Sequence, residues 1–90
     1  MEKDHVSALK RAIAIAGNQI ELAQGMRKFF ANNPPPHGKG VRVRQQTISY
    51  WLSNEVFIGA EYWPAIESVT DGRVTRRDLR PDVFSRDHAA

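Results

Sequence analysis

The sequence predicts an all-α fold, a small single domain of about five helices. In the N-terminal segment apolar residues recur three or four positions apart, as on one face of a helix: Val6, Leu9, Ile13 and Ala16. Residues 19–31 and 45–53 likewise combine an apolar stripe with a polar face. The 90 residues, 41% of them hydrophobic, suffice for one core but not for two.

The first two helices have recognisable ends. We expect the first helix over residues 3–16, followed by Gly17, because glycine readily forms a left-handed cap. The second is expected over residues 19–31, where Asn18 can cap the N-terminus and Glu21 can reach back to the amide of Asn18.

The second helix carries a narrow apolar stripe of Leu22, Ala23 and Met26. Small Ala23 allows another helix to approach closely. Gly25 costs about 1 kcal/mol relative to alanine within a helix, so this helix is expected to depend on packing more than on intrinsic propensity.

The third helix, residues 45–53, divides sharply into two faces. At 100° per residue, an arc of about 140° holds Gln45, Gln46, Ser49 and Tyr50. The other side of the helix holds Ile48, Trp51 and Leu52. One face is therefore expected to be buried, while the other offers amides, a hydroxyl and a phenol.

The C-terminal third is expected to add two short helical segments. Residues 60–69 form a fourth helix with Pro64 in its first turn, where proline is tolerated, and Asp71 and Gly72 supply the exit. Thr75 and Asp78 can cap a last helical turn.

Aromatic and aliphatic residues are expected to close a core behind the third helix: Trp51, Tyr62, Trp63, Ile66, Leu79, Val83 and Phe84. A partner-binding aromatic groove is the alternative. Phe57 and Ile58 follow the third helix in a loop without periodic partners, and such an exposed pair is a candidate oligomer contact.

Positive charge is concentrated in the middle of the chain. The net charge is +3, and no acidic residue stands between Glu21 and Glu55. That interval contains Arg27, Lys28, Lys39, Arg42 and Arg44. Such segregation is typical of a surface that faces phosphates; the alternative is a basic loop that only keeps the protein soluble.

The second and third helices together predict a helix-turn-helix DNA reader. Glutamine forms paired hydrogen bonds with adenine, and serine can donate or accept at base edges. Gln19 lies in the first turn of the second helix, where exposed amides attract a phosphate. The alternative for Gln45 and Gln46 is an ordinary solvated helix face.

NQIELAQ, residues 18–24, followed by QQTISYWL, residues 45–52, resembles the Cro/repressor type of regulator. The segment 64–82, PAIESVTDGRVTRRDLRPD, is similar to the Cro-like group that includes the YdaS prophage regulators and antitoxins. The resemblance implies a lambda-repressor-like bundle whose third helix enters the major groove. It further implies that Gln45, Gln46 and Tyr50 face bases, and that Asn18 and Gln19 meet phosphates.

The chain departs from that family pattern between the two helices. A tight turn is usual there, whereas this sequence has a long insertion, about residues 32–43, that contains NNPPPHGKG. Its prolines must end the second helix, and we expect a mobile surface loop outside the core. Lys39 and Arg42 either contact the DNA backbone or belong to a spacer without a partner.

No pattern indicates an enzyme. His5, His37 and His88 are scattered without metal-ligand or catalytic spacing, and we expect all three to be solvated. HGKG lacks the spacing of a phosphate-binding loop. Cysteine is absent, which excludes disulfides and thiolate metal sites. We expect no cofactor, no metal, no signal peptide and no membrane span, and hence a cytoplasmic protein.

The sequence therefore predicts a transcription regulator of prophage or plasmid origin that binds a double-stranded DNA operator as a homodimer. Residues 1–84 are expected to form the DNA-binding domain and residues 85–90 a flexible tail. The expected base-reading residues are Gln45, Gln46, Ser49 and Tyr50. The expected phosphate-binding residues are Asn18, Gln19, Lys39, Arg42 and Arg44. The alternative is an antitoxin-like module that binds a toxin or another regulator.

Overall fold

The computed structural model describes residues 3–34 and 43–81, which form an all-helical domain as predicted. Its elements are α1 (Asp4–Ala16), α2 (Gln19–Asn32), α3 (Gln45–Asn54), the 3-10 helix η1 (Ala60–Tyr62), α4 (Trp63–Val69) and α5 (Arg76–Leu79). Several predicted features lie outside the described residues: most of the insertion with His37, Lys39 and Arg42, and the C-terminal stretch with Val83, Phe84, His88 and the tail 85–90.

The junction of α1 and α2 has the two predicted cap residues, Gly17 and Asn18. Gly17 has a φ of 123° and its N–H donates to the carbonyl of Ile13. At the start of α2, the Asn18 Oδ1 accepts a hydrogen bond of 2.9 Å from the Glu21 N–H. Two strong local signals therefore fix where α1 ends and α2 begins.

The predicted fourth helix, residues 60–69, is divided in the structure, and the expectation of one continuous helix is wrong. An α-helix would require the residue at position 64 to donate to the carbonyl of Ala60, but Pro64 has no N–H. The Trp63 N–H donates to Ala60 instead, which is the shorter spacing of a 3-10 turn. The chain therefore forms η1 first and continues as α4.

The end of α4 and the start of α5 match the prediction. Asp71 and Gly72 both have positive φ, 53° and 77°, as the exit turn requires. The Thr75 N–H then donates to Asp78 Oδ2 at 2.9 Å and begins α5. Arg76 forms an ion pair with Glu67 of α4 and lowers the pKa of that carboxyl group.

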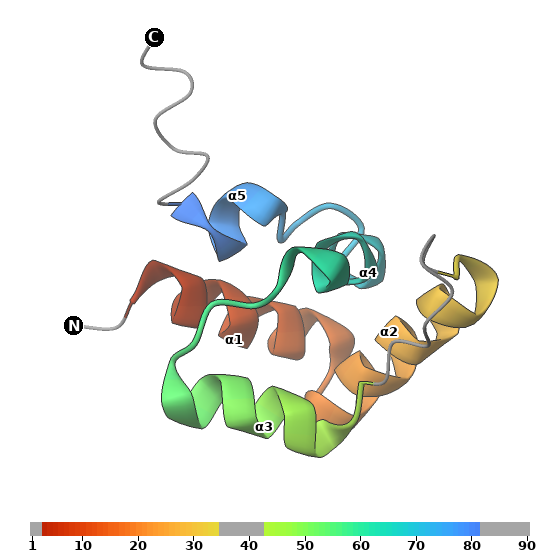
Figure 1. The fold of residues 1–90 in the computed structure, drawn as a ribbon, viewed down its shortest axis with the longest axis horizontal. Coiled ribbons are helices and arrows are strands. Elements are labelled where there is room, and N and C mark those ends of the chain that lie inside the picture. Colours follow the sequence, from red (N-terminus) through yellow and green to blue (C-terminus); the bar gives the residue numbers. More distant parts are fainter. Residues whose placement is uncertain (1–2, 35–42, 82–90) are drawn as a thin grey trace, which may run out of the picture.

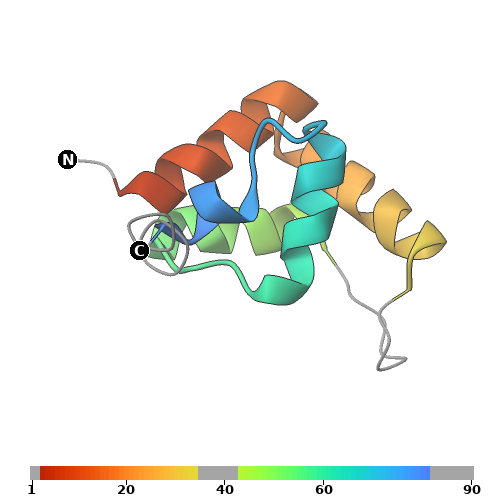
Figure 2. The same ribbon diagram turned by 90° about the horizontal axis from the view of Figure 1, so that it is seen from above.

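The helices surround one core, and α2 contacts α1, α3 and α4. In the view of Figure 1, α3 forms one edge of the molecule, α4 and α5 lie at the opposite edge, and α1 lies between them. Figure 2 shows the same helices from above, with α4 crossing over the middle of the domain. One long face of α3 is thereby left at the surface.

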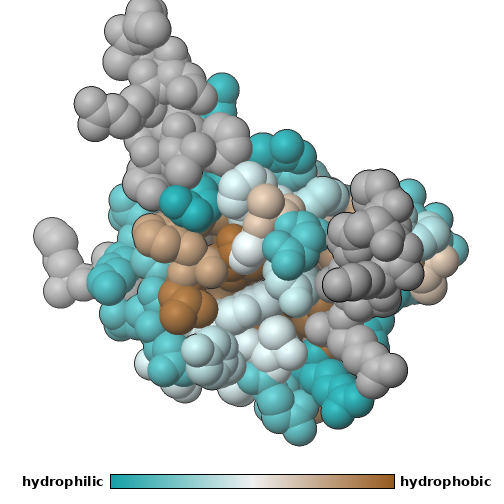
Figure 3. All heavy atoms as spheres, viewed as in Figure 1, coloured by the Kyte–Doolittle hydropathy of each residue, from teal (hydrophilic) through white to brown (hydrophobic). Residues whose placement is uncertain are grey.

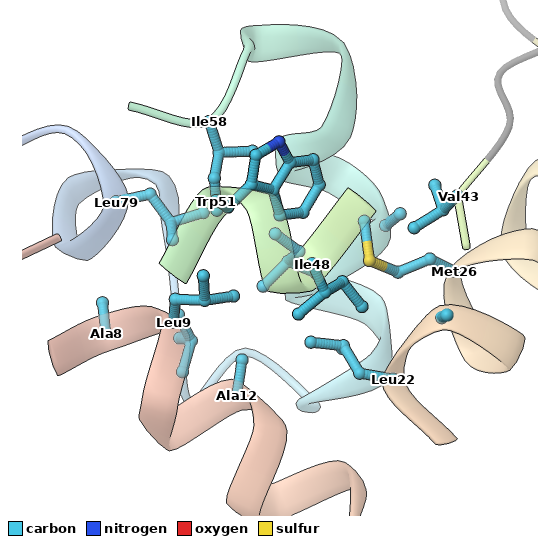
Figure 4. Packing of buried hydrophobic residues seen from close by; sticks show 14 residues of the cluster. Ala8, Leu9, Ala12, Leu22, Met26, Val43, Ile48, Trp51, Ile58 and Leu79 are labelled. Carbon is cyan, nitrogen blue, oxygen red and sulfur yellow. The ribbon is translucent and has the colours of Figure 1, made fainter. Parts of the chain in front are cut away.

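Every α-helix of the described residues contributes to the buried apolar cluster, whereas η1 has no buried residue. Its members are Ala8, Leu9, Ala12, Leu22, Ala23, Met26, Val43, Ile48, Trp51, Ile58, Ala65, Ile66, Val74 and Leu79. Figure 4 shows Ile48 beside Leu22 and Met26. Tyr62 and Trp63 pack against the cluster from its edge. The predicted core is confirmed for the described residues.

Gly25 is explained by the approach of α4. A Cβ atom at this position would lie 3.0 Å from Val69 Cγ2, closer than side chains normally pack. The absence of a side chain thus lets α2 and α4 come together, which offsets the low helix propensity of glycine.

Trp51 provides a test of the core. Its side chain is only 7% exposed and its ring lies 5.0 Å from that of Tyr62, centroid to centroid. We expect Trp51→Ala to reduce the free energy of unfolding by about 3 to 5 kcal/mol, because it leaves a large cavity. The neighbouring Tyr50→Ala is the control, since Tyr50 is 58% exposed and its loss should leave the thermal melt nearly unchanged. Equal melting temperatures for the two variants would contradict the burial of Trp51 in the core.

Candidate nucleic-acid interface

The two faces of α3 are oriented as predicted. Ile48 and Trp51 point into the core, whereas Gln45, Gln46 and Tyr50 are exposed. The exposed side chains begin at the first residue of α3 and continue along one side for two turns. The surface they form is polar, and burial of the opposite, apolar face of α3 holds the helix in place.

Ser49 occupies a different position from the other predicted base-reading residues. It is half-buried, and its Oγ donates a hydrogen bond of 2.7 Å to the Oε1 of Gln19. Gln19 is the first residue of α2, so this bond ties the outer surface of α3 to the N-terminus of α2. The sequence identified both residues but not the bond, because 30 positions separate them.

Two of the five predicted phosphate-binding residues lie at the N-terminus of α2, where Gln19 contacts α3 through Ser49. Asn18 is exposed, but its Oδ1 is occupied by the Glu21 N–H. Gln19 is half-buried through its contact with Ser49. Because the first turn of a helix carries unpaired N–H groups and partial positive charge, this end of α2 favours an anion.

The N-terminus of α3 is fixed by contacts on both sides of Arg44. The Arg44 N–H donates to Thr47 Oγ1 at 3.3 Å, which caps the helix. Val43 is fully buried, and its carbonyl accepts a 2.8 Å hydrogen bond from Arg27 Nη1. The Arg44 side chain is exposed beside the glutamines. Arg27 was recognised in the sequence only as a charge, since nothing local indicates its bond to residue 43.

The C-terminus of α3 is held by α1. Glu55 adopts a left-handed conformation, and its carbonyl accepts a 2.8 Å hydrogen bond from His5 Nε2. Lys3 also lies 3.4 Å from the Glu55 carboxylate. His5 is only 8% exposed, so the expectation that it is solvated is wrong. Its ring is instead used to satisfy a carbonyl at a helix end.

The expected exposed pair after α3 is only half correct. Phe57 is 46% exposed, with the His5 ring 4.3 Å away and the Arg80 guanidinium 4.2 Å from its centroid. Ile58 is 3% exposed and joins the core, which excludes it as a surface contact of the folded domain. Its carbonyl accepts a hydrogen bond from Trp63 Nε1, and this turns the segment inward. Figure 3 shows a small apolar area where the chain leaves α3.

Two further searches of the described residues give negative results. Residues 3–34 and 43–81 contain no group of three His, Asp or Glu side chains placed to hold a metal ion. Over the same ranges, no helix is both long enough and apolar enough to span a bilayer.

Comparison with known proteins gives two matches. A family described as "Bacterial toxin YdaS" matches residues 38–87. The chain is also similar to a protein of Escherichia coli (strain K12) named "Putative transcriptional regulator YdaS". The two are 30% identical over 83 residues, which cover 92% of this chain and 68% of that relative. No solved structure matches the chain.

The bond between Gln19 and Ser49 can be measured without any ligand. In a double-mutant cycle of Gln19→Ala and Ser49→Ala, we expect a coupling free energy of about 0.5 to 1.5 kcal/mol, the usual range for a partly buried hydrogen bond. The control cycle pairs Ser49→Ala with Gln24→Ala, an exposed glutamine elsewhere on α2, and should be additive. Additive free energies in both cycles would mean that Gln19 and Ser49 do not interact.

Proposed function

The chain belongs to the YdaS family, and from that premise we propose that it is a sequence-specific DNA-binding transcription regulator. The name of the E. coli relative supports the regulatory role. The observation that carries the proposal is the polar outer face of α3, with Gln45, Gln46 and Tyr50 exposed and the opposite face buried.

In the proposed complex α3 lies in the major groove. A major groove admits an α-helix, and the amides of Gln45 and Gln46 have the geometry to pair with base edges. Tyr50, one turn further along α3, extends the contact surface. These three residues supply sequence discrimination, because contacts to base edges distinguish one site from another.

Phosphate contacts would surround that surface. The exposed Arg44 stands immediately before α3, and Gln19 opens α2. We assign Asn18, Gln19 and Arg44 to the phosphates, and extend the same role to Lys39 and Arg42 from their positive charge in the sequence. Such contacts orient the protein on the duplex without reading its sequence.

We further propose that the protein binds its operator as a homodimer. A twofold dimer places its two recognition helices about 34 Å apart, on one face of the duplex. Phe57, exposed beyond the end of α3, is the described residue that we propose for contact between the copies. This role makes the protein a non-catalytic cytoplasmic regulator, and the resemblance to Cro-like proteins suggests a prophage or plasmid origin.

The family description favours a second candidate, in which the chain acts on a protein partner as part of a toxin system. Expression of the parent and of a Gln45→Ala, Gln46→Ala double variant in bacteria separates the two roles. Growth inhibition that persists in the variant would indicate a toxic activity independent of base reading. Inhibition that disappears would be a consequence of DNA binding.

Gln46→Ala tests the proposed function directly. We expect it to weaken binding to the specific operator by about 1 to 3 kcal/mol, with little change on random DNA, because a lost base contact matters only at the correct site. Arg44→Ala should instead weaken binding to the operator and to random DNA alike. It should also lower the slope of the logarithm of the binding constant against the logarithm of salt concentration by about one unit. The measurements are titrations at several salt concentrations, with Gln24→Ala as the control for loss of an exposed glutamine. Equal losses on both DNAs for Gln46→Ala would remove it from base reading.

A further inference from the structure

The surface that α3 presents carries no charge. Residues 45–54, QQTISYWLSN, contain neither an acidic nor a basic side chain. The exposed groups are the amides of Gln45 and Gln46 and the phenol of Tyr50, with the Ser49 hydroxyl behind them. A reading helix of this composition can recognise only some of the base pairs well.

The four base pairs differ in which side chains fit them in the major groove. Guanine offers two acceptors and is most often bound by arginine or lysine, neither of which occurs in α3. Adenine offers one acceptor and one donor, N7 and N6, which a glutamine amide matches with two hydrogen bonds. Thymine adds a methyl group that an aromatic ring can cover.

The hydrogen bond of Ser49 limits which base edges this side chain can contact. A hydroxyl has one proton, and that of Ser49 is donated to Gln19 Oε1. Towards the groove Ser49 can therefore only accept. Acceptors match the exocyclic amino groups of adenine and cytosine, and not the O6 and N7 of guanine.

We propose that the operator half-site presents consecutive A·T pairs to α3, with adenines bound by Gln45 and Gln46 and a thymine methyl covered by Tyr50. This inference rests on the proposed DNA-binding function and names its ligand. Arg44, the residue immediately before α3, is the cation nearest to this surface in sequence, and its proposed partner is a phosphate rather than a base.

The first test is selection of binding sites from a duplex pool randomised over about 20 base pairs, the span of two half-sites. We expect enriched half-sites with A·T pairs at their centre. An enriched site with G·C pairs at the positions that lose their preference in Gln46→Ala would overturn the inference but leave the DNA-binding function intact. No enriched sequence at all would overturn the proposed function itself.

The second test removes single groups from the selected DNA. Replacing the contacted adenine by 7-deazaadenine deletes N7, and we expect about tenfold weaker binding by the parent but little change for Gln46→Ala. Replacing the contacted thymine by uracil should weaken the parent several-fold and leave Tyr50→Ala nearly unaffected. Gln24→Ala is the control and should respond as the parent does. Equal sensitivity of the parent and the reading-face variants would contradict the assigned contacts.

Discussion

The burial of Ile48 and Trp51 is the constraint on which the candidate interface depends. Both side chains belong to the apolar cluster, and Trp51 contacts Tyr62 edge to face at 5.0 Å. Figure 4 shows the two side chains projecting from α3 into the cluster, among residues of α1, α2 and α5. Because they fix the rotation of α3 about its axis, the side chains on the opposite face must point into solvent. Core packing therefore determines which groups can meet a ligand.

Three long-range hydrogen bonds then fix the two ends and the outer side of α3. Arg27 binds the Val43 carbonyl before the helix, His5 binds the Glu55 carbonyl after it, and Gln19 accepts from Ser49 between them. They come from α1 and α2, and each is between 2.7 and 2.8 Å long. The position of α3 is consequently defined by the described helices, although the sequence between α2 and α3 is much longer than a tight turn.

Local patterns predicted much of the fold because their causes are local. The capping of α2 by Asn18, the exit at Asp71 and Gly72, and the two faces of α3 all follow from residues a few positions apart. His5 and Ile58 were assigned wrongly because their burial depends on how distant segments fold together. The bond of His5 to Glu55 spans 50 positions, and no helical period reveals it. The division into η1 and α4 could have been anticipated, since Pro64 cannot donate to Ala60.

The central claim is that the polar face of α3 contacts DNA, and the most direct test is an NMR titration of the ¹⁵N-labelled protein with its selected operator duplex. The account predicts the largest shifts at the amides of Gln45, Gln46 and Tyr50 and of the first turn of α2, and small shifts throughout α5, which Figure 1 places at the opposite edge of the domain. Large shifts in α5 with an unperturbed α3 would contradict it.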